Sequence, residues 1–494
     1  MDFLDQIEAW SQNGEHQRII DTIEALAEEE RTPQIISLLA RAYNNLAEGE
    51  NVGPLWKAID LLRSVEEALH DDPAWNFRMG YAYYYLDQEG PALYYFERTL
   101  ETGPEDEETE DLIRDCRQRL ALPRFEKPFR ERSAEAWDSF LAGEAELRAM
   151  MEERTDSERL MSRCGEMLAP VFTDVAFQLG FNGEKYELVL SPEGSRAKLF
   201  QLASFQGLAP TGVLERWNIL IGRQPSRNFR LSMSGLDIEA EDVSVLVQEP
   251  ENGCVALSLY CEKLLPLLRE DEGHAYWLLS ILLDQTLGEL SVMELVDDFT
   301  VVETPADGAS IPLDRLAEHL EEKGFSLVRD SNLPLERYTA YEMEPEDEAD
   351  LRLDVFAGMT RCPSFINEYL QGKSGLMDEL HEDGAVPGFF YYPLDGFAEG
   401  EGRGQQVLDF RESVEAAIIQ EAGEEAITFT GGASGLHYGY LDFIAWDLEP
   451  ALDAAARVFE GSPLAWAAFH TFRRDVGGVM LKGEPEEGQD GESN

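Results

Sequence analysis

The chain has 494 residues, and 98 Asp and Glu against 40 Lys and Arg give it a formal net charge of −58. Its hydrophobic content of 44% suffices for folded cores, which excludes a wholly disordered acidic chain. The acidity disfavours nucleic acids and anionic membranes as partners, because both attract basic surfaces. No apolar run approaches the roughly 20 residues of a membrane span, and the N-terminal segment is acidic where a secretory signal is basic. We therefore expect a cytoplasmic protein of two to four domains.

The first pattern along the chain is a pair of helices over residues 73–106. Gly80 and Ala92 would let the two helices approach closely, and Tyr83 and Phe96 would fill the space beside them. Pro104 would end the second helix. The same order of residues recurs upstream at Ala40, Tyr43, Ala58 and Leu62, and a further helix pair precedes these.

This pattern resembles the tetratricopeptide repeat, a helix–turn–helix unit of about 34 residues. A polar helix over residues 106–120 reads as the cap that a short repeat array requires. We therefore expect a helical repeat module over residues 1–121, followed by a linker that ends at Pro128.

Four aromatic residues form a stripe on the first helix of the best repeat. Phe77, Tyr81, Tyr84 and Tyr85 lie at positions i, i+4, i+7 and i+8. The resemblance implies that this face lines a concave groove that holds extended peptides. The alternative is that the next domain packs on the stripe and buries it. An acidic groove of this kind would suit a protein or peptide partner with basic and apolar side chains.

The remainder of the chain alternates strand-like and helical segments, which predicts two α+β layer domains. The first, over residues 128–304, begins with two charged helices and continues with strands at 186–190, 217–221, 243–247 and 255–260. The second, over residues 310–482, has strand-like segments at 351–356 and 426–429, an aromatic run at 389–392 and a further segment at 438–445. Residues 483–494 read as an acidic disordered tail.

Several sequence segments are similar to those of a family of bacterial tetratricopeptide-repeat proteins that has no assigned activity. They are Tyr341–Pro345, Asp354–Gly358, Gly439–Asp447 and Phe469–Gly478. The resemblance covers most of the chain and implies no catalytic residues.

The weak candidates for chemistry lie in the last domain. His470 could titrate near neutral pH, and Arg473 is a rare cation in so acidic a chain. Together with His437 they could form a hydrolase-like site, or they could be structural. A thiolate at Cys362 beside Arg361 is a further alternative. The glycine-rich segment 430–436 lacks the lysine of a phosphate-binding loop and is expected to be a tight turn.

The spacing of cysteine and histidine residues contains no zinc, haem or iron–sulfur signature, so we expect no metal and no cofactor. The sequence thus favours a non-enzymatic cytoplasmic adaptor or scaffold that binds a peptide or protein through the repeat groove. The alternative is a hydrolase-like enzyme with its site around His437, His470 and Arg473.

Overall fold

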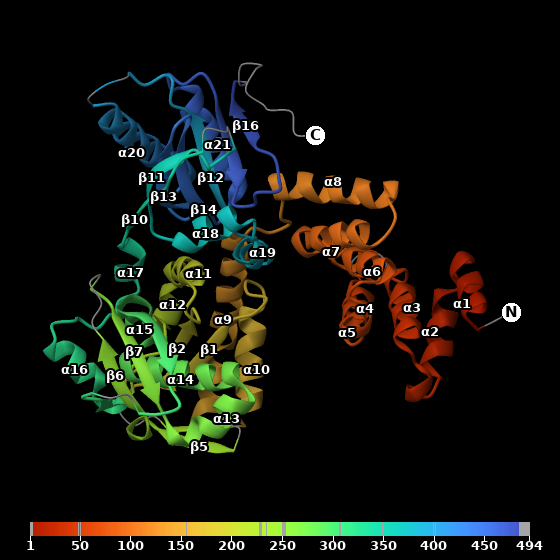
Figure 1. Ribbon diagram of the computed structural model, residues 1–494, viewed down its shortest axis with the longest axis horizontal. Helices are drawn as coiled ribbons and strands as arrows, with labels where there is room; N and C mark the ends of the chain where they lie inside the picture. The colour runs from red at the N-terminus through yellow and green to blue at the C-terminus, as the bar shows by residue number, and fades with distance from the viewer. Residues whose placement is uncertain are drawn as a thin grey trace.

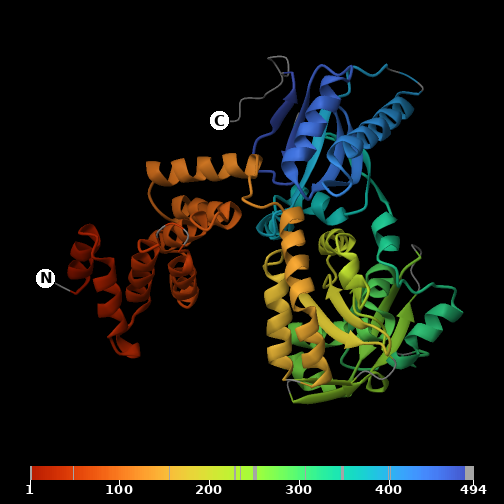
Figure 2. The ribbon, with the colours of Figure 1, turned by 180° about the vertical axis from the view of Figure 1, so that it is seen from behind.

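The computed structural model describes residues 3–483 apart from positions 48, 50, 155, 227–229, 234, 249–252, 306–307, 347–349, 399 and 401. An arm of helices projects from a larger body that contains the sheets (Figures 1 and 2). The expected tail lies outside the described residues except for Gly483. Among the described residues, no helix combines the length and apolarity needed to cross a bilayer.

The described residues of the arm form eight α-helices, which is compatible with the expected helical module. They are α1 (Phe3–Gln12), α2 (His16–Glu24), α3 (Pro33–Asn44), α4 (Gly53–Arg63), α5 (Glu66–Leu69), α6 (Pro73–Tyr84), α7 (Glu89–Thr102) and α8 (Glu107–Ala121). Three helix starts are fixed by side-chain caps. Thr32, Asp72 and Asp106 each accept a hydrogen bond from a backbone N–H in the first turn of α3, α6 and α8.

Helices α6 and α7 pack closely where the sequence predicts it. A side-chain carbon at Gly80 would lie 2.7 Å from the ring of Phe96, so only glycine permits this approach. Ala92 and Phe96 are fully buried, and Tyr83 stacks on Tyr95 with ring centroids 5.8 Å apart. The small and large positions of the repeat pattern therefore form the core of the arm.

The body begins with two long helices, α9 (Phe129–Glu152) and α10 (Ser157–Leu168). They are followed by a three-stranded sheet in the order β1 (Ala176–Phe181), β2 (Tyr186–Ser191), β3 (Trp217–Ile221). Strands β2 and β3 are parallel, and α11 (Arg196–Gly207) and the short α12 (Thr211–Leu214) connect them. Strand β1 was not expected from the sequence.

A four-stranded sheet forms a second unit of the body with its own core. Its order is β8 (Val296–Val301), β7 (Val255–Tyr260), β6 (Ser244–Gln248), β9 (Ile311–Pro312). It is joined by α13 (Leu265–Glu270), α14 (Glu272–Leu287), α15 (Glu289–Leu295), α16 (Leu316–Glu322) and the hairpin β4 (Arg230–Met233) with β5 (Leu236–Glu239). Because Leu313, Leu316 and Leu320 belong to this core, the boundary expected at 304–310 falls inside the unit.

The last part of the body is a seven-stranded antiparallel sheet. Its order is β10 (Thr339–Glu342), β11 (Val355–Thr360), β13 (Ile427–Gly435), β14 (Tyr438–Ala445), β12 (Val386–Pro393), β15 (Ala467–Thr471), β16 (Val479–Lys482). The helices α20 (Arg403–Ala422) and α21 (Leu448–Glu460) cover the face that carries Phe390, and α18 (Pro363–Gln371) and α19 (Gly375–Glu382) are associated with the other. The short α17 (Asn332–Glu336) precedes the sheet.

Two local expectations about this sheet are wrong. The strand expected at 351–356 begins only at Val355, because Arg352 takes a left-handed backbone conformation with φ of 69°. The glycine-rich segment at 430–436 is not a tight turn. It lies within β13, where Gly431 and Gly432 pass so close to neighbouring backbone that side chains would collide.

The two expected α+β domains share a core. Phe129 on α9 packs against Trp446 of the last region at a ring-centroid distance of 5.2 Å, and one hydrophobic cluster joins residues of α9, α11 and the seven-stranded sheet. Residues 128–304 and 310–482 therefore do not form two separate cores. The four-stranded unit is the part with a core of its own.

Candidate functional site

The aromatic stripe lies on α6 and at the residue that follows it. Tyr85 is 53% exposed, whereas Phe77, Tyr81 and Tyr84 are half-buried. The rings form a chain, with centroids 6.3 Å apart between Phe77 and Tyr81 and 4.5 Å apart between Tyr81 and Tyr85. Burial raises the pKa of Tyr81 to about 12, so its hydroxyl stays neutral at physiological pH. The stripe is thus a partly open row of neutral rings.

Helix α8 covers one end of the stripe. The hydroxyl of Tyr84 donates to Asp115 Oδ2 at 2.7 Å, and Arg119 lies over its ring at 4.9 Å and donates to the same hydroxyl. Phe96 of α7 contacts Phe77 and Tyr84 from behind. These contacts come from inside the arm. These contacts therefore do not support the alternative in which a later domain buries the stripe. Because Tyr84 is held by α8, it serves packing within the arm and is not free to contact a partner.

A groove lies along α1, α3 and the first turns of α6, with a volume of about 390 Å³. We call it the arm groove. Ala74 and Arg78 line it and share a helix face with Tyr81 and Tyr85, at spacings of three and four residues. The carboxylates of Asp5 and Glu8 lie on its opposite side. The groove therefore combines cationic and anionic side chains, and Tyr81 and Tyr85 continue the same face of α6 beyond it.

Arg78 is the central cation of the arm groove. Its Nη1 donates to Ser37 Oγ at 2.5 Å, and burial lowers the pKa of its guanidinium to about 10. Glu8 is held by Arg41 at 2.8 Å, and this ion pair keeps the pKa of Glu8 below its usual range. A peptide in the groove would thus meet fixed charges of both signs.

The two histidines proposed for a hydrolase-like site lie apart. Phe389 of β12 pairs with His470, whereas Pro393 pairs with Tyr438, the neighbour of His437. Four residues of a strand separate these points by about 13 Å, and β14 and β15 lie on opposite sides of β12. The structure does not bring His437 and His470 together.

His470 has a structural environment. It is 3% exposed and stacks on Phe389, and its two ring nitrogens lie 2.6 Å and 3.1 Å from the carbonyl oxygens of Thr471 and Val476. Burial lowers the pKa of His470, and the two carbonyl oxygens oppose this shift. These contacts position the turn that leads from β15 to β16.

Arg473 faces the arm and not the histidines. Its buried guanidinium pairs with Asp378 of α19 and with Asp475, and a side chain at Gly90 of α7 would collide with this ion pair. Arg473 therefore lies in the interface between the arm and the seven-stranded sheet, where its ion pair packs against Gly90.

A second polar cluster at this contact was missed from the sequence. Glu89 of α7 pairs with Arg119 at 3.3 Å, and its other carboxylate oxygen lies 3.7 Å from His381 Nε2 of α19. Burial raises the pKa of Glu89 and lowers that of His381 to about 4. Within the part of the chain that the structure describes, His381 Nδ1 is buried without a hydrogen-bond partner.

These residues border a cavity of about 810 Å³ beside the linker 122–126. Glu89 and His381 are almost 300 positions apart in the chain, so no spacing in the sequence could have indicated the cluster. The polar groups of this cluster interact with one another across the contact between the arm and α19. The cluster therefore contributes to that contact.

The described residues contain no group of three or more His, Cys, Asp or Glu side chains placed to hold a metal ion. Cys362 is buried, and this burial raises its pKa to about 12 despite the opposing effect of Arg196. A thiolate at Cys362 is therefore disfavoured at neutral pH.

Comparison with known proteins gives no relative: no family model, no curated protein and no solved structure matches the chain.

Proposed function

We propose that the chain is a non-enzymatic cytoplasmic adaptor or scaffold whose arm is a tetratricopeptide-like module that binds a peptide segment of another protein. The segment would lie in the arm groove and along the exposed part of the stripe. Its apolar side chains would contact Tyr81 and Tyr85, and its basic side chains would meet Asp5 and Glu8.

The observation that carries this proposal is the open end of the stripe. Tyr85 is 53% exposed, and its ring lies 4.5 Å from that of Tyr81 on the helix face that also lines the arm groove. Adjacent aromatic rings at a groove supply large contact area at little entropic cost, which is typical of binding surfaces. The hydrolase-like alternative has no comparable support, because its histidines are far apart.

The test selects peptides from a displayed random library on the full chain and measures their affinity for variants. Replacing Tyr81 and Tyr85 by alanine should weaken the selected peptides at least about thirtyfold, because an aromatic anchor commonly contributes 2 kcal/mol or more. The fold should remain, since both rings are partly exposed.

The matched control is Tyr94→Ala on α7. Tyr94 is a tyrosine of the same helix pair and is 59% exposed, but it does not belong to the stripe. Its loss should leave the affinity within twofold. Equal weakening by both changes, or selected peptides without basic and apolar residues, would contradict the proposal.

A further inference from the structure

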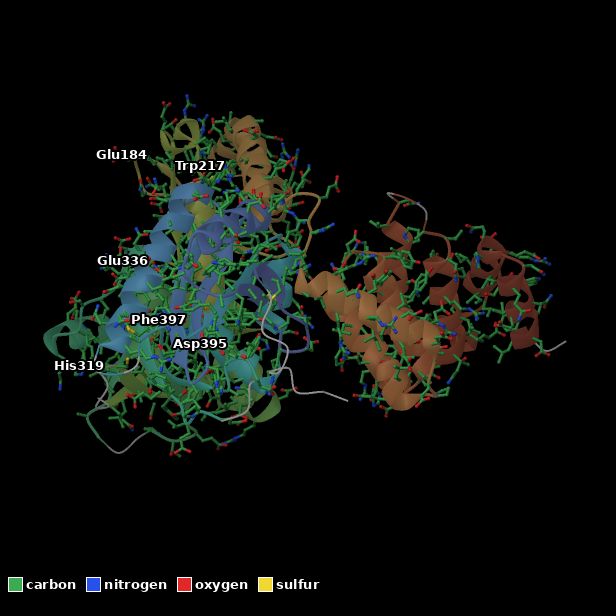
Figure 3. The ribbon with its side chains drawn as sticks, turned by 90° about the horizontal axis from the view of Figure 1, so that it is seen from above. Glu184, Trp217, His319, Glu336, Asp395 and Phe397 are labelled. Atoms are coloured by element: carbon green, nitrogen blue, oxygen red, sulfur yellow. The ribbon has the colours of Figure 1, made fainter. Side chains whose placement is uncertain are left out.

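A second groove lies where the arm meets the seven-stranded sheet. It has a volume of about 830 Å³, and its walls are α7, α8 and the segment 475–478 that leads into β16. Figures 1 and 2 show the C-terminal end of α8 reaching the edge of the sheet that carries β16, and Figure 3 shows from above how the arm stands beside the body. We call this the junction groove. It is distinct from the arm groove, which lies on α1, α3 and α6.

The junction groove has an apolar strip along its length. Leu100 of α7, Ala121 of α8 and Val476 beyond β15 contribute partly exposed side chains, whereas Ile113 of α8 is buried in its wall. Leu100 and Val476 are partly buried against the core of the arm, so the strip joins both parts of the molecule. Apolar surface that stays open to solvent between two parts of a protein is typical of a docking site.

Carboxylates outnumber cations around this strip. The groove is lined by Glu97, Glu101, Glu110 and Asp475 but by only two arginines, Arg114 and Arg117. Both arginines are already paired, Arg114 with Asp111 and Arg117 with Glu97, each at 2.7 Å. Three of the four carboxylates are paired as well: Glu97 with Arg117, Glu101 with Arg98 at 3.4 Å, and Asp475 with Arg473 at 3.3 Å. Among the described residues, Glu110 is the lining carboxylate without an ion pair, and it would attract a cationic occupant.

The groove also offers backbone groups at the start of an edge strand. β16 is the last strand of its sheet and pairs with β15 alone among the described strands, and the groove ends at Gly478, directly before it. Gly477 and Gly478 are exposed and carry no side chain that would shield their peptide groups. An extended segment can form main-chain hydrogen bonds at such a place.

We propose that the junction groove binds an extended segment of a partner protein in which apolar and basic side chains alternate. Alternation suits the site because successive side chains of an extended chain point to opposite sides. Apolar residues would contact the strip at Leu100, Ala121 and Val476. Basic residues would reach Glu110 and, in competition with Arg98, Glu101. This inference does not depend on the proposed role of the stripe.

Two other occupants fit the charge less well. The chain's own last eleven residues, 484–494, carry five carboxylates and no cation, so the acidic rim would repel them. A second copy of the chain brings a net charge of −58 to the same rim. A basic segment from another protein is the occupant that the groove complements.

The test uses a fluorescent ten-residue peptide of alternating lysine and valine as the probe, with the full chain in 150 mM salt. The double change Glu101→Lys with Glu110→Lys should weaken binding about tenfold or more, and Val476→Ser should weaken it severalfold without any change in charge. The matched control is Glu28→Lys with Glu29→Lys, which makes the same change in charge at an exposed turn of the arm. It should leave the affinity within twofold.

Five outcomes would overturn the proposal. Equal losses in the groove and control variants would mean diffuse attraction to an acidic protein, and equal binding of a glutamate–valine peptide would remove the charge argument. Tighter binding after deletion of residues 484–494 would identify the tail as the occupant. Dimerisation that the Val476→Ser change abolishes would identify a second copy. Loss of probe binding in the Tyr81→Ala, Tyr85→Ala variant alone would place the probe at the stripe, which tests the proposed function separately.

Discussion

The arm and the seven-stranded sheet differ in how far they expose their unusual side chains: the arm leaves aromatic rings partly exposed, whereas the sheet buries charged groups. In the arm, each helix packs mainly on its neighbours in the chain, and one row of rings on α6 stays partly open. In the sheet, strands distant in sequence lie side by side, and Arg352 and Asp442 form an ion pair in which both side chains are 1% exposed. The difference teaches that an unusual side chain marks a binding surface only where the architecture leaves it accessible.

The buried ion pair illustrates the sheet's side of this comparison. The guanidinium of Arg352 bonds both oxygens of Asp442, at 2.7 Å and 3.0 Å, and lies over the rings of Phe389, Tyr440 and Phe472. A charge in such surroundings is retained only with its partner, because an unpaired buried ion is costly. The pair therefore holds the turn before β11 against β14.

The largest expected effect comes from breaking this pair. Arg352→Leu should lower the free energy of unfolding by about 3–5 kcal/mol, since Asp442 would remain buried without a partner. The double change Arg352→Leu with Asp442→Leu should recover much of the loss, because no lone charge remains. Urea denaturation of Arg352→Leu, Asp442→Leu and the double variant measures this. A double variant less stable than the sum of the single ones would refute the argument.

A smaller effect is expected at the contact between the two regions. Burial lowers the pKa of His381 to about 4, so the folded state resists its protonation. The unfolded histidine binds a proton near pH 6.5, and this group therefore costs the folded state stability as the pH falls from about 6.5 to 4. His381→Gln removes this dependence. As the pH falls from about 6.5 to 4, the unfolding free energy of the variant should therefore increase by about 2 kcal/mol relative to that of the parent.

Asp378 should change the stability with pH in the direction opposite to His381, so a variant at Asp378 is the control for this prediction. Burial raises its pKa to about 6, so its folded form binds a proton more readily and gains stability as the pH falls from about 6 to 4. Asp378→Asn should therefore lose stability relative to the parent on acidification. If both variants follow the parent at every pH, the contact does not titrate.

Replacing Gly80 by alanine tests the close packing of α6 and α7 in the arm, and the same change at Gly165 in the body is the control. Gly80→Ala should cost about 1–2 kcal/mol, because the added carbon meets the ring of Phe96 at 2.7 Å and outweighs the better helix propensity of alanine. Gly165→Ala in α10 has nothing within 4 Å and should stabilise by up to about 1 kcal/mol. Thermal melting compares the two. A neutral Gly80→Ala would show that α6 and α7 pack less closely.

The smallest effect concerns salt. Raising NaCl from about 10 mM to 150 mM shortens the Debye length from about 30 Å to 8 Å and screens the repulsion within a chain of net charge −58. We expect the melting temperature to rise by a few degrees. Hydrogen exchange should slow more in the arm than around the Arg352–Asp442 pair, since buried charges are screened little. A uniform change in both regions would contradict this distinction.

Most elements near the N-terminus follow from the sequence because their causes are local. The cap residues Thr32, Asp72 and Asp106 begin helices within a turn of themselves, and the 34-residue spacing from Ala58 to Ala92 places small residues where helices meet. The stripe on α6 was also visible, because residues three and four apart share a helix face. Its partial cover by α8 follows only from the way the last helix folds back onto Tyr84.

What the tertiary structure alone decided involves residues far apart in the chain. The sequence by itself determined the helical arm, the strands from Tyr186 and Tyr438, and an acidic surface. It did not determine that β12 lies between β14 and β15, which separates His437 from His470, or that Arg473 turns toward Asp378 and the arm. Strand order and the burial of a charge depend on non-local packing, whereas periodicity records only a residue's near neighbours. For that reason the groove between the arm and the sheet became visible only in the folded chain.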